Sequence, residues 1–364
     1  MSREKLIQLM DDYGFDAVAV NAGPSLTYLT GLHFHLMERP VVIVFTRNAE
    51  PTIILPELEK AKLDRLQFEA RVYTYGEDPT GWDQKFTLAL KDLNLNGGRV
   101  GVEPRQLRFL EYQLLKKAVP GCDWQDGSDL IAALRAVKGA EEIACMQKAV
   151  HIAEAALEAT LPMVKEGVTE KEIAAELFLQ LMQHGSENDL PFSPIVAAGP
   201  NSANPHSKPS SRKLQNGDLL IIDWGARYSG YASDLTRTFG VGELGKTEKE
   251  IHQLVLDANK AGRQAGHVGG TCGQVDRATR KVIVNGGYGE FFTHRTGHGI
   301  GLECHEDPYI RDDNEQKLLA GMTYTVEPGI YLNGRNGVRI EDDVLITEDG
   351  ALSLSTMTRE LRFL

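Results

Sequence analysis

The chain has 364 residues, of which 42% are hydrophobic and 25% charged, an ordinary globular composition that excludes disorder over the whole length. It carries 39 Lys and Arg against 51 Asp and Glu, a formal net charge of −12, and no basic block, which argues against a nucleic-acid partner. No apolar stretch approaches the roughly 20 residues that cross a bilayer, so no membrane partner is expected.

The first residues lack the apolar core of a signal peptide, which favours a cytoplasmic location. The cysteines are widely scattered and form no C-x-x-C pair: Cys122, Cys145, Cys272 and Cys304. This pattern predicts neither a disulfide framework nor a thiolate metal site, and it also favours a reduced, cytoplasmic compartment.

The first 130 residues alternate short apolar runs with amphipathic stretches. Strands are expected at residues 16–20, 41–45, 52–55, 71–73 and 99–102. Helices are expected at residues 57–66, 82–93 and 106–117. Strands that alternate with helices predict an α/β layered domain.

The pattern changes near residue 130. A long amphipathic helix is expected at 141–160, ended by Pro162, and Thr169 with Glu172 fits the capping box of a second helix. A loop at 200–209 follows, and then strands at 219–222, 235–239, 323–326 and 338–346 with helices at 249–266 and 274–285. We place the boundary between Asp126 and Lys138 and expect domains at 1–130 and 131–364.

Two aspartates flank the turn between the strands 219–222 and 235–239. Asp223 ends the first strand and Asp234 precedes the second. With the turn centred near Tyr228 and Ser229, the two carboxylates would lie directly opposite each other. Like charges in that position destabilise a sheet, and a cation between them would reverse the effect.

Three further segments carry acids and histidines. Residues 294–306 contain His294, His298 and His305, with glycines around His298. Glu327 ends the strand 323–326, and Arg339 and Glu341 share one face of the strand 338–346. Each feature alone has an ordinary reading as a turn acid, a structural histidine or a surface ion pair, so the inference depends on their joint occurrence.

Together these segments supply five candidate ligands: Asp223, Asp234, His298, Glu327 and Glu341. An oxygen-rich set with one imidazole suits Mn²⁺ and Co²⁺ as well as Zn²⁺. Two ions about 3.5–4 Å apart need about this many ligands.

The same residues resemble the motifs of the pita-bread (M24) metallopeptidase family, which includes prolidases, aminopeptidase P, methionine aminopeptidase and creatinase. Residues 223–238 resemble its paired-aspartate hairpin, 294–306 its histidine–glycine stretch, and 325–329 with 339–341 its two glutamate motifs. Residues 135–142 and 21–32 extend the likeness over nearly the whole chain. The resemblance implies an α+β protein, with a C-terminal pita-bread catalytic domain preceded by a smaller α/β creatinase-like domain.

The resemblance also implies roles for individual residues. Two divalent cations, Mn²⁺ first with Co²⁺ or Zn²⁺ as alternatives, would be held by the five ligands above. Catalytic roles would fall to His206, His294, His305, Glu327 and Arg339. Among these, Glu327 would shuttle a proton, and Arg339 would orient Glu341 or a neighbouring acid. Cys304 is expected to be inert, because adjacent strand residues point to opposite sides.

The implied activity is metal-assisted hydrolysis of the Xaa-Pro bond, foremost in dipeptides, by a homodimer that pairs through its N-terminal domain. Aminopeptidase P, which acts on longer Xaa-Pro peptides, is the alternative within the family. Methionine aminopeptidase would leave the first 130 residues surplus, and creatinase does not use the metal ligands. A non-catalytic module that binds peptides or proteins, and a side activity on esters or organophosphates, remain alternatives of other kinds.

Overall fold

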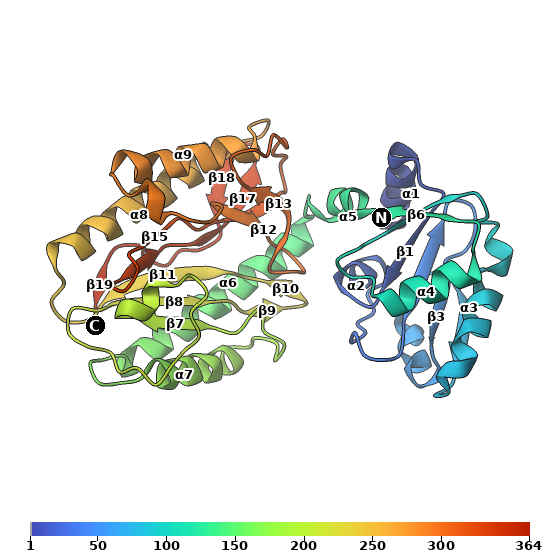
Figure 1. The fold of residues 1–364 in the computed structure, drawn as a ribbon, viewed down its shortest axis with the longest axis horizontal. Coiled ribbons are helices and arrows are strands. Elements are labelled where there is room, and N and C mark those ends of the chain that lie inside the picture. The colour runs from blue at the N-terminus through green and yellow to red at the C-terminus, as the bar shows by residue number, and fades with distance from the viewer. Residues whose placement is uncertain (1) are drawn as a thin grey trace. The chain divides into compact units, whose positions relative to one another are not determined.

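The computed structural model describes residues 2–364, which divide into two compact units, one ending at Arg135 and the other running from Ala136 to Leu364 (Figure 1). Both units combine helices with sheets, as the predicted α+β class requires. Among the described helices, none combines the length and the apolar character that a bilayer crossing needs.

Unit 1 is built around one six-stranded mixed sheet of order β4-β3-β2-β1-β5-β6. Its strands are β1 (Ala17–Asn21), β2 (Val42–Thr46), β3 (Thr52–Pro56), β4 (Arg71–Tyr75), β5 (Arg99–Val102) and β6 (Asp123–Asp126). Its α-helices are α1 (Ser2–Tyr13), α2 (Pro24–Thr30), α3 (Trp82–Leu90), α4 (Phe109–Ala118) and α5 (Ser128–Arg135). Short 3₁₀ helices are η1 (Glu57–Arg65), η2 (Pro79–Gly81) and η3 (Lys91–Leu93).

Successive residues of β1 serve two separate cores, one on each face of this sheet. Val18 and Val20 pack with α1, α2 and α5, whereas Ala17 and Ala19 pack with α3 and α4. A strand buried on both faces reads as an unbroken apolar run, which is why β1, β2 and β3 were predictable. The predicted helix at 57–66 is a 3₁₀ helix, and α1, α2, α5 and β6 were missed.

Unit 2 holds four longer helices: α6 (Ala140–Thr160), α7 (Glu170–Gln183), α8 (Lys246–Ala265) and α9 (Cys272–Asn285). A four-stranded sheet, β19-β11-β8-β7, contains β7 (Ile195–Ala198), β8 (Leu219–Trp224), β11 (Leu235–Gly240) and β19 (Arg362–Phe363). A five-stranded sheet, β13-β12-β14-β17-β18, contains β12 (Gly297–Gly299), β13 (Glu306–Ile310), β14 (Thr323–Val326), β17 (Asp342–Thr347) and β18 (Gly350–Ser353). Two short pairs are β9 (Arg227–Tyr228) with β10 (Tyr231–Ala232), and β15 (Gly329–Tyr331) with β16 (Gly337–Arg339). The 3₁₀ helices are η4 (Leu161–Met163), η5 (Gly199–Ala203) and η6 (Gly289–Phe291).

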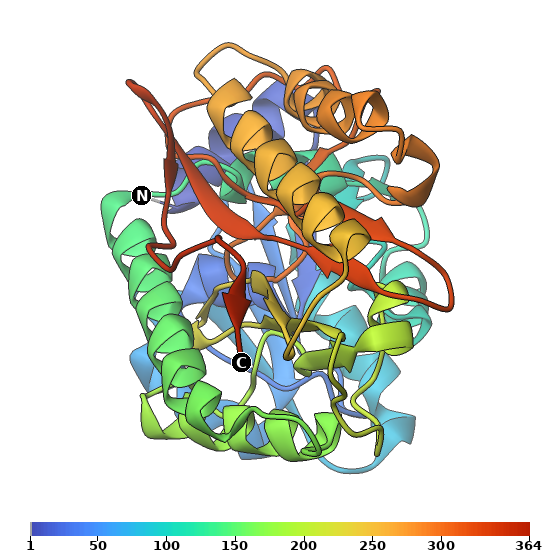
Figure 2. The same ribbon diagram turned by 90° about the vertical axis from the view of Figure 1, so that its left-hand side faces the viewer.

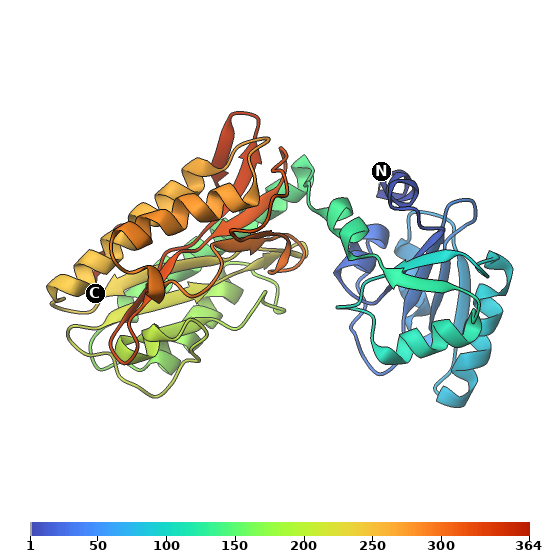
Figure 3. The same ribbon diagram turned by 45° about the horizontal axis from the view of Figure 1, so that its top comes forward.

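The strands of unit 2 lie between two helix pairs, α6 with α7 and α8 with α9 (Figures 1 and 2). Helices α8 and α9 run side by side (Figure 3). Trp224 at the end of β8 is fully buried and donates through Nε1 to the carbonyl of Ala153 at 2.8 Å, which ties this strand to α6. The predicted capping box is confirmed: the Thr169 hydroxyl accepts from Glu172 N, and the Glu172 carboxylate accepts from Thr169 N.

The hairpin of β8 and β11 differs from the prediction by one residue at its turn. Its tip is Ser229–Gly230, both with positive φ, flanked by the pair Tyr228↔Tyr231. Two positive φ values in a two-residue turn are the type I′ geometry that matches the strand twist. The turn centre moves by one residue and the pairing by two, so Asp223 lies opposite Thr236 rather than opposite Asp234.

Two further predictions need correction. The strand expected at 338–346 is broken at Ile340–Glu341, because β16 pairs with β15 while β17 pairs with β14. The segment 200–209, expected to be a loop throughout, begins inside the 3₁₀ helix η5. The break at 340–341 places Glu341 between the two-stranded sheet of β15 and β16 and the five-stranded sheet that contains β17.

Candidate metal centre

The five predicted ligands lie on, or directly next to, five different strands of unit 2. Asp223 lies on β8, Asp234 directly precedes β11, His298 is the middle residue of β12, Glu327 directly follows β14, and Glu341 occupies the break before β17. An isolated bridge joins Thr236 of β11 to Glu341, the residue directly before β17. Residues 118 positions apart in the chain therefore meet at one place.

The side chains of these residues form one buried cluster. Ligand atoms of Asp223, Asp234 and Glu341 lie within 4.8 Å of one another, and so do those of His298, Glu327 and Glu341. A third group joins Asp234 and His298 to His305, which is itself exposed. All five predicted ligands are thus brought together, with His305 beside them.

His298 is oriented to offer its Nε2 lone pair. Nδ1 lies 3.2 Å from the carbonyl oxygen of Gly299, and since a carbonyl only accepts, Nδ1 carries the proton. Burial, and then His305, hold the pKa of His298 well below its usual value, so Nε2 is unprotonated. Nε2 nevertheless faces Glu327 Oε1 at 3.4 Å and Asp234 Oδ2 at 3.7 Å. A lone pair facing two ionised carboxylate oxygens is repulsive unless a proton or a metal cation lies between them.

A close backbone approach makes room for this histidine. A Cβ on Gly297, the residue before it, would lie 1.8 Å from the carbonyl oxygen of Thr325. The His298 amide, in turn, donates to the Thr325 hydroxyl at 3.2 Å. Glycine at this position therefore lets β12 and β14 approach closely enough to bring His298 beside Glu327.

The carboxylates of the cluster are strongly perturbed. Burial raises the pKa of Glu327 to about 8, and burial together with the neighbouring acids raises those of Asp234 and Glu341 well above their usual values. Burial also raises the pKa of Asp223, although Arg339 opposes it. Acids buried this closely hold protons unless a cation neutralises them.

The residues present fit a divalent cation centre. Four carboxylates and one neutral imidazole form the donor set, and Asp223 Oδ1 is buried with no hydrogen-bond partner among residues 2–364. A buried carboxylate oxygen without a partner is costly, and metal coordination satisfies it. Such oxygen-rich sets suit Mn²⁺ and Co²⁺ as well as Zn²⁺.

Arg339 lies behind the cluster at the end of β16. Its Nη2 donates to Asp223 Oδ2 at 2.6 Å, and its Nε donates to the Thr236 hydroxyl at 3.1 Å. That hydroxyl donates in turn to Glu341 Oε2 at 2.7 Å. The arginine therefore holds Asp223 directly and Glu341 through Thr236.

His294 is held neutral by a second chain of contacts. Its Nδ1 donates to the Arg295 carbonyl at 2.8 Å, so the Tyr331 hydroxyl, 2.9 Å from Nε2, donates to that nitrogen. Arg339 Nη1 donates to the same hydroxyl at 3.0 Å. Burial lowers the pKa of His294 to about 4, which fits this arrangement.

The other two predicted histidines lie at the rim of the cluster. The ring of His305 lies 4.0 Å from that of His298, centroid to centroid. His206 is exposed, in the loop after η5, and its charge acts on the pKa of both Asp223 and His294. Both rings are therefore near the cluster and accessible from outside it.

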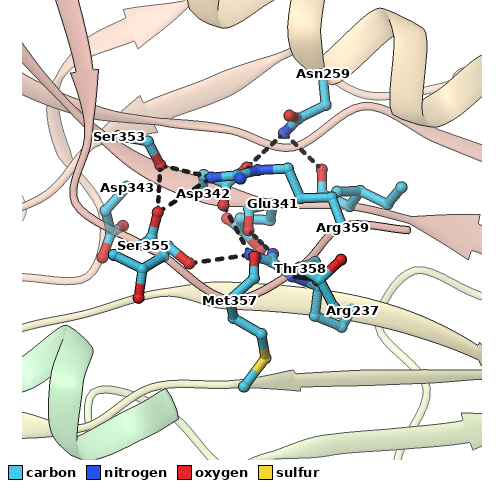
Figure 4. A network of polar contacts seen from close by, with 12 residues as sticks. Arg237, Asn259, Glu341, Asp342, Asp343, Ser353, Ser355, Met357, Thr358 and Arg359 are labelled. Carbon is cyan, nitrogen blue, oxygen red and sulfur yellow. Dashed lines mark hydrogen bonds and ion pairs between the residues drawn. The ribbon is translucent and has the colours of Figure 1, made fainter. Parts of the chain in front are cut away.

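A polar network around Asp342 connects residues beside Glu341 to Arg237 of β11 and to the C-terminal segment (Figure 4). Asp342, adjacent to Glu341, accepts from Arg237 Nη2 at 2.9 Å, Asn259 Nδ2 at 3.0 Å and Arg359 Nε at 2.6 Å. Burial alone would raise the pKa of Asp342, but the two arginines outweigh it and lower the pKa to about 2. Arg237 also donates to the Glu341 carbonyl at 2.6 Å, so one guanidinium links the strand after Asp234 to the residue that precedes β17.

Cys304, which we expected to be an inert thiol pointing away from His305, lies at the cluster. Its Sγ donates to Asp234 Oδ2 at 3.0 Å. The expectation relied on strand alternation, but residues 301–305 form bends before β13 begins. Burial, and then the charge of Asp234, raise the pKa of the thiol well above its usual value, consistent with a protonated donor.

Sequence reasoning therefore missed three contributors: Tyr331, Cys304 and the Asp342 network. Tyr331 lies two residues after Gly329 in a short apolar run, and this position only weakly indicates that its hydroxyl contacts the cluster. The partners of Asp342 are Arg237, Asn259 and Arg359, which come from three separate segments of the chain. No local sequence pattern therefore indicates the network.

Comparison with known proteins covers both units. A model of metallopeptidase family M24 matches residues 144–348, and a model of the Creatinase/Prolidase N-terminal domain matches residues 3–137. The chain is 35% identical to a Xaa-Pro dipeptidase from Lactobacillus delbrueckii subsp. lactis, over 100% of this chain and 99% of that protein.

Two solved structures share the fold. A dipeptidase from Pyrococcus horikoshii OT3 superimposes with a TM-score of 0.93 at 38% identity, covering 100% of both chains. An X-Pro aminopeptidase from Thermotoga maritima superimposes with a TM-score of 0.86 at 32% identity, covering 100% of this chain and 99% of that one.

Proposed function

The chain belongs to metallopeptidase family M24, with a creatinase-type N-terminal domain before the pita-bread domain, and from this premise we propose that it hydrolyses the Xaa-Pro bond of dipeptides. The observation that carries the proposal is the buried cluster of Asp223, Asp234, His298, Glu327 and Glu341. The full-length likeness to a Xaa-Pro dipeptidase supports the choice of substrate. We place the creatinase-like domain at residues 1–130 and the pita-bread domain, which carries the chemistry, at residues 131–364.

In this proposal the five residues hold two divalent ions. Bound there, the ions would polarise the substrate carbonyl and lower the pKa of an attacking water. We propose Mn²⁺ as the native ion, because four of the five ligands are carboxylates and oxygen ligands suit harder cations.

The chain's own residues then have distinct tasks. The proline nitrogen of the scissile bond carries no hydrogen and must gain a proton as it leaves. Glu327 is suited to deliver it, because its carboxyl lies in the cluster, 3.4 Å from His298 Nε2, beside the atoms that would hold the ions. The rim histidines His206 and His305 are accessible to the substrate and would donate to its carboxylate or its developing oxyanion.

The remaining residues of the cluster orient these groups. Neutral His294 is fixed by Tyr331 and by the Arg295 carbonyl, which together set the orientation of its ring. Arg339 holds the Asp223 carboxylate so that Oδ1 remains available to a cation. Partners of this kind fix the direction of a ligand's lone pairs.

Aminopeptidase P activity is a second candidate. The likeness to the Thermotoga maritima X-Pro aminopeptidase covers the whole chain at 32% identity, so the same fold accommodates longer substrates. The two activities differ in whether the site accepts residues after proline, which a substrate series measures directly.

The decisive experiment is a kinetic panel on the purified full chain with Mn²⁺, Co²⁺ or Zn²⁺. Ala-Pro and Leu-Pro are compared with Ala-Pro-Ala, and with Ala-Ala as a peptide without proline. We expect kcat/KM for the dipeptides to exceed that for the tripeptide by at least about tenfold, roughly 1.4 kcal/mol of transition-state discrimination. Cleavage of the tripeptide alone would assign the aminopeptidase activity instead.

Matched variants test whether the cluster does the chemistry. Asp234→Asn and His298→Ala should lower kcat/KM by more than about a hundredfold, the upper end of effects seen for mere partners of metal ligands. His267→Ala is the control, since His267 is exposed on the same unit. If wild-type protein bound no divalent ion and cleaved none of the peptides, the non-catalytic binding role would replace this proposal.

Two further parts of the proposal concern the protein's state. We propose a cytoplasmic location, because all four cysteines are free thiols in the described structure. We propose a homodimer that pairs through unit 1, where Leu36, Met37 and Phe109 are 47%, 48% and 72% exposed and Arg108 donates to the Met37 carbonyl. Light scattering of wild type and of Phe109→Ser measures the mass, and a monomeric wild type would refute the dimer.

A further inference from the structure

A buried carboxylate of α7 holds both ends of the loop that carries His206. Glu170 is the first residue of α7 and is fully buried. Its Oε1 accepts from Ala198 N at 2.8 Å, directly before residues 199–210, which we call the rim loop. Its Oε2 accepts from Ser210 N at 2.9 Å and from the Ser210 hydroxyl at 2.6 Å, at the end of that loop. One side chain therefore closes the rim loop at its base.

The interior of the rim loop contacts the same carboxylate. The side-chain amide of Asn201 donates to Glu170 Oε1 at 3.0 Å and lies 3.1 Å from Oε2. It also donates to the Ser210 hydroxyl at 3.2 Å. These donors to Glu170 are neutral groups from the two ends and the interior of one loop, and the N-terminus of α7 favours the negative charge. The buried charge is therefore compensated by the loop that it holds.

The rim loop is also joined to the strand that carries Arg339. Ser202 is fully buried, and its hydroxyl accepts from Gly337 N at 2.7 Å. Gly337 begins β16, the strand that ends at Arg339. Arg339 Nη1 donates to the carbonyl of Pro205, the residue before His206, at 3.4 Å. Contacts on two sides of the loop therefore set the position of the imidazole relative to the cluster.

We propose that Glu170 is a positioning residue for the substrate: it fixes the rim loop so that the ring of His206 stays at the rim of the metal centre. This role rests on the proposed function, in which His206 donates to the substrate. A buried charge is costly unless its donors compensate it, and here the compensating donors all fix one loop. A site residue on a loop depends on such support, because loops are held less precisely than helices and strands.

Replacing Glu170 by glutamine should separate the loop from the metal centre. Glutamine has the same shape but places an amide NH₂ where one oxygen now accepts, so the donors at one end of the loop lose their acceptor. The rim loop should then loosen, and His206 with it. The five predicted metal ligands come from other segments and should keep their places. Activity should therefore fall through His206 and not through loss of metal.

The first test measures the loop and needs no activity. Hydrogen exchange of backbone amides is recorded on the full chain, and the peptide that covers the rim loop is compared among variants. We expect faster exchange in Glu170→Gln than in the wild type and no change in Glu172→Gln. Glu172 is the matched control, because it lies in the same helical turn but its carboxylate accepts from Thr169 N. Equal exchange in all three proteins would overturn the proposal.

The second test asks whether activity is lost through His206. The value of kcat/KM for Ala-Pro is measured with Mn²⁺ for the wild type, Glu170→Gln, His206→Ala and the double variant. We expect Glu170→Gln to lower kcat/KM about tenfold in the wild-type background and less than about twofold in the His206→Ala background. The dissociation constant for Mn²⁺ should stay within about twofold of the wild type, because none of the donors to Glu170 is a predicted ligand. Equal losses in both backgrounds, or a weakened metal site, would show a general structural effect and overturn the proposal.

Ser210→Ala keeps the test decisive if Glu170→Gln does not fold. It removes one hydroxyl donor and leaves the carboxylate in place. We expect kcat/KM to fall about threefold where His206 is present and to be unchanged in the His206→Ala background. The same loss in both backgrounds would overturn the proposal.

The same measurements distinguish this inference from the proposed function. If the wild type cleaves Xaa-Pro dipeptides but neither variant is coupled to His206, only the role of Glu170 fails. If the wild type cleaves none of the peptides, the proposed function fails and this role fails with it.

Discussion

Arg339 holds one oxygen of Asp223 and leaves the other open: Nη2 donates to Oδ2 at 2.6 Å, while Oδ1 finds no hydrogen-bond partner in residues 2–364. The same guanidinium also donates to Tyr331 and to Thr236. A planar group with five donors can satisfy three acceptors at fixed angles, and a lysine ammonium cannot. Arg339 thereby fixes the direction in which Asp223 faces the centre.

Replacing Arg339 should therefore reduce metal affinity more than it reduces folding. For Arg339→Lys we expect the dissociation constant for Mn²⁺, measured by calorimetry, to rise about 10- to 100-fold. Arg335→Lys is the control, because Arg335 is 58% exposed in its side chain and lies in the neighbouring turn. An unchanged dissociation constant in Arg339→Lys would contradict this role.

Removal of the metal should destabilise unit 2, and more so at alkaline pH. The pKa of Glu327 is raised to about 8, so between about pH 4.5 and 8 the metal-free folded state binds more protons than the unfolded state. Stability of the metal-free protein therefore falls as pH rises through this window. With Mn²⁺ at a hundredfold excess over its dissociation constant, one site adds about 2.7 kcal/mol.

Differential scanning calorimetry with Mn²⁺ or with a chelator, at pH 5.5 and pH 8, measures this linkage. We expect the chelator to lower the Tm at both values and to lower it further at pH 8. A Tm that does not respond to chelation would mean that the four acids of the cluster do not bind metal in the folded protein.

The Asp342 network should stabilise the strands that carry the ligands. Arg359→Met removes a charged hydrogen bond of 2.6 Å to a fully buried carboxylate, although Arg237 and Asn259 still contact it. We expect a loss of about 1.5–3 kcal/mol in the free energy of unfolding by urea. Arg277→Met, whose ion pairs are exposed, should change it by less than about 1 kcal/mol. Equal effects of the two would count against a special role for the network.

His252 on α8 should make the protein sensitive to acid. It is 2% exposed, and burial lowers its pKa to about 4, below the value near 6.5 of an unfolded histidine. Between pH 6.5 and 4 the unfolded state therefore binds more protons, so stability is lost as pH falls. The loss from this residue reaches about 3 kcal/mol across the window.

The measurement compares urea unfolding at pH 7 and pH 4.5 for wild type, His252→Gln and His267→Gln. We expect the difference between the two pH values to shrink in His252→Gln and to persist in His267→Gln, where the histidine is exposed. The same difference in all three proteins would show that other groups govern the acid response.

Local sequence patterns predicted the features that depend on neighbouring residues, namely apolar strands, a helix cap and acids at strand ends. An acid that ends an apolar strand, such as Asp223 or Glu327, can be recognised in the sequence. A buried charge is costly unless a partner or a metal ion compensates it, so such an acid is a candidate ligand. The hairpin register was not visible, since it depended on Ser229 adopting a positive φ. The side-chain direction of Cys304 was missed because strand alternation was applied to a segment of bends.

Tertiary contacts explain the remaining misses. Asp342 is recognised as a buried acid only when Arg237 and Arg359 are folded onto it, from 105 and 17 residues away. Tyr331 lies on a three-residue strand, too short to show a period. The family motifs carried the ligand set, but no motif described what holds the ligands in place.

The ligands span positions 223 to 341. They meet only when β8 has paired with β11 in one sheet and β14 has paired with β12 and β17 in the other. In chains whose contacts are this distant in sequence, the pairing of remote strands is a slow, late step of folding. A cation held by these residues would therefore not nucleate the fold as zinc does in a small finger; it would bind a scaffold whose strands have already paired. Metal uptake would then report completed folding, and a kinetic trace of Mn²⁺ capture would time the last event in the maturation of the protein.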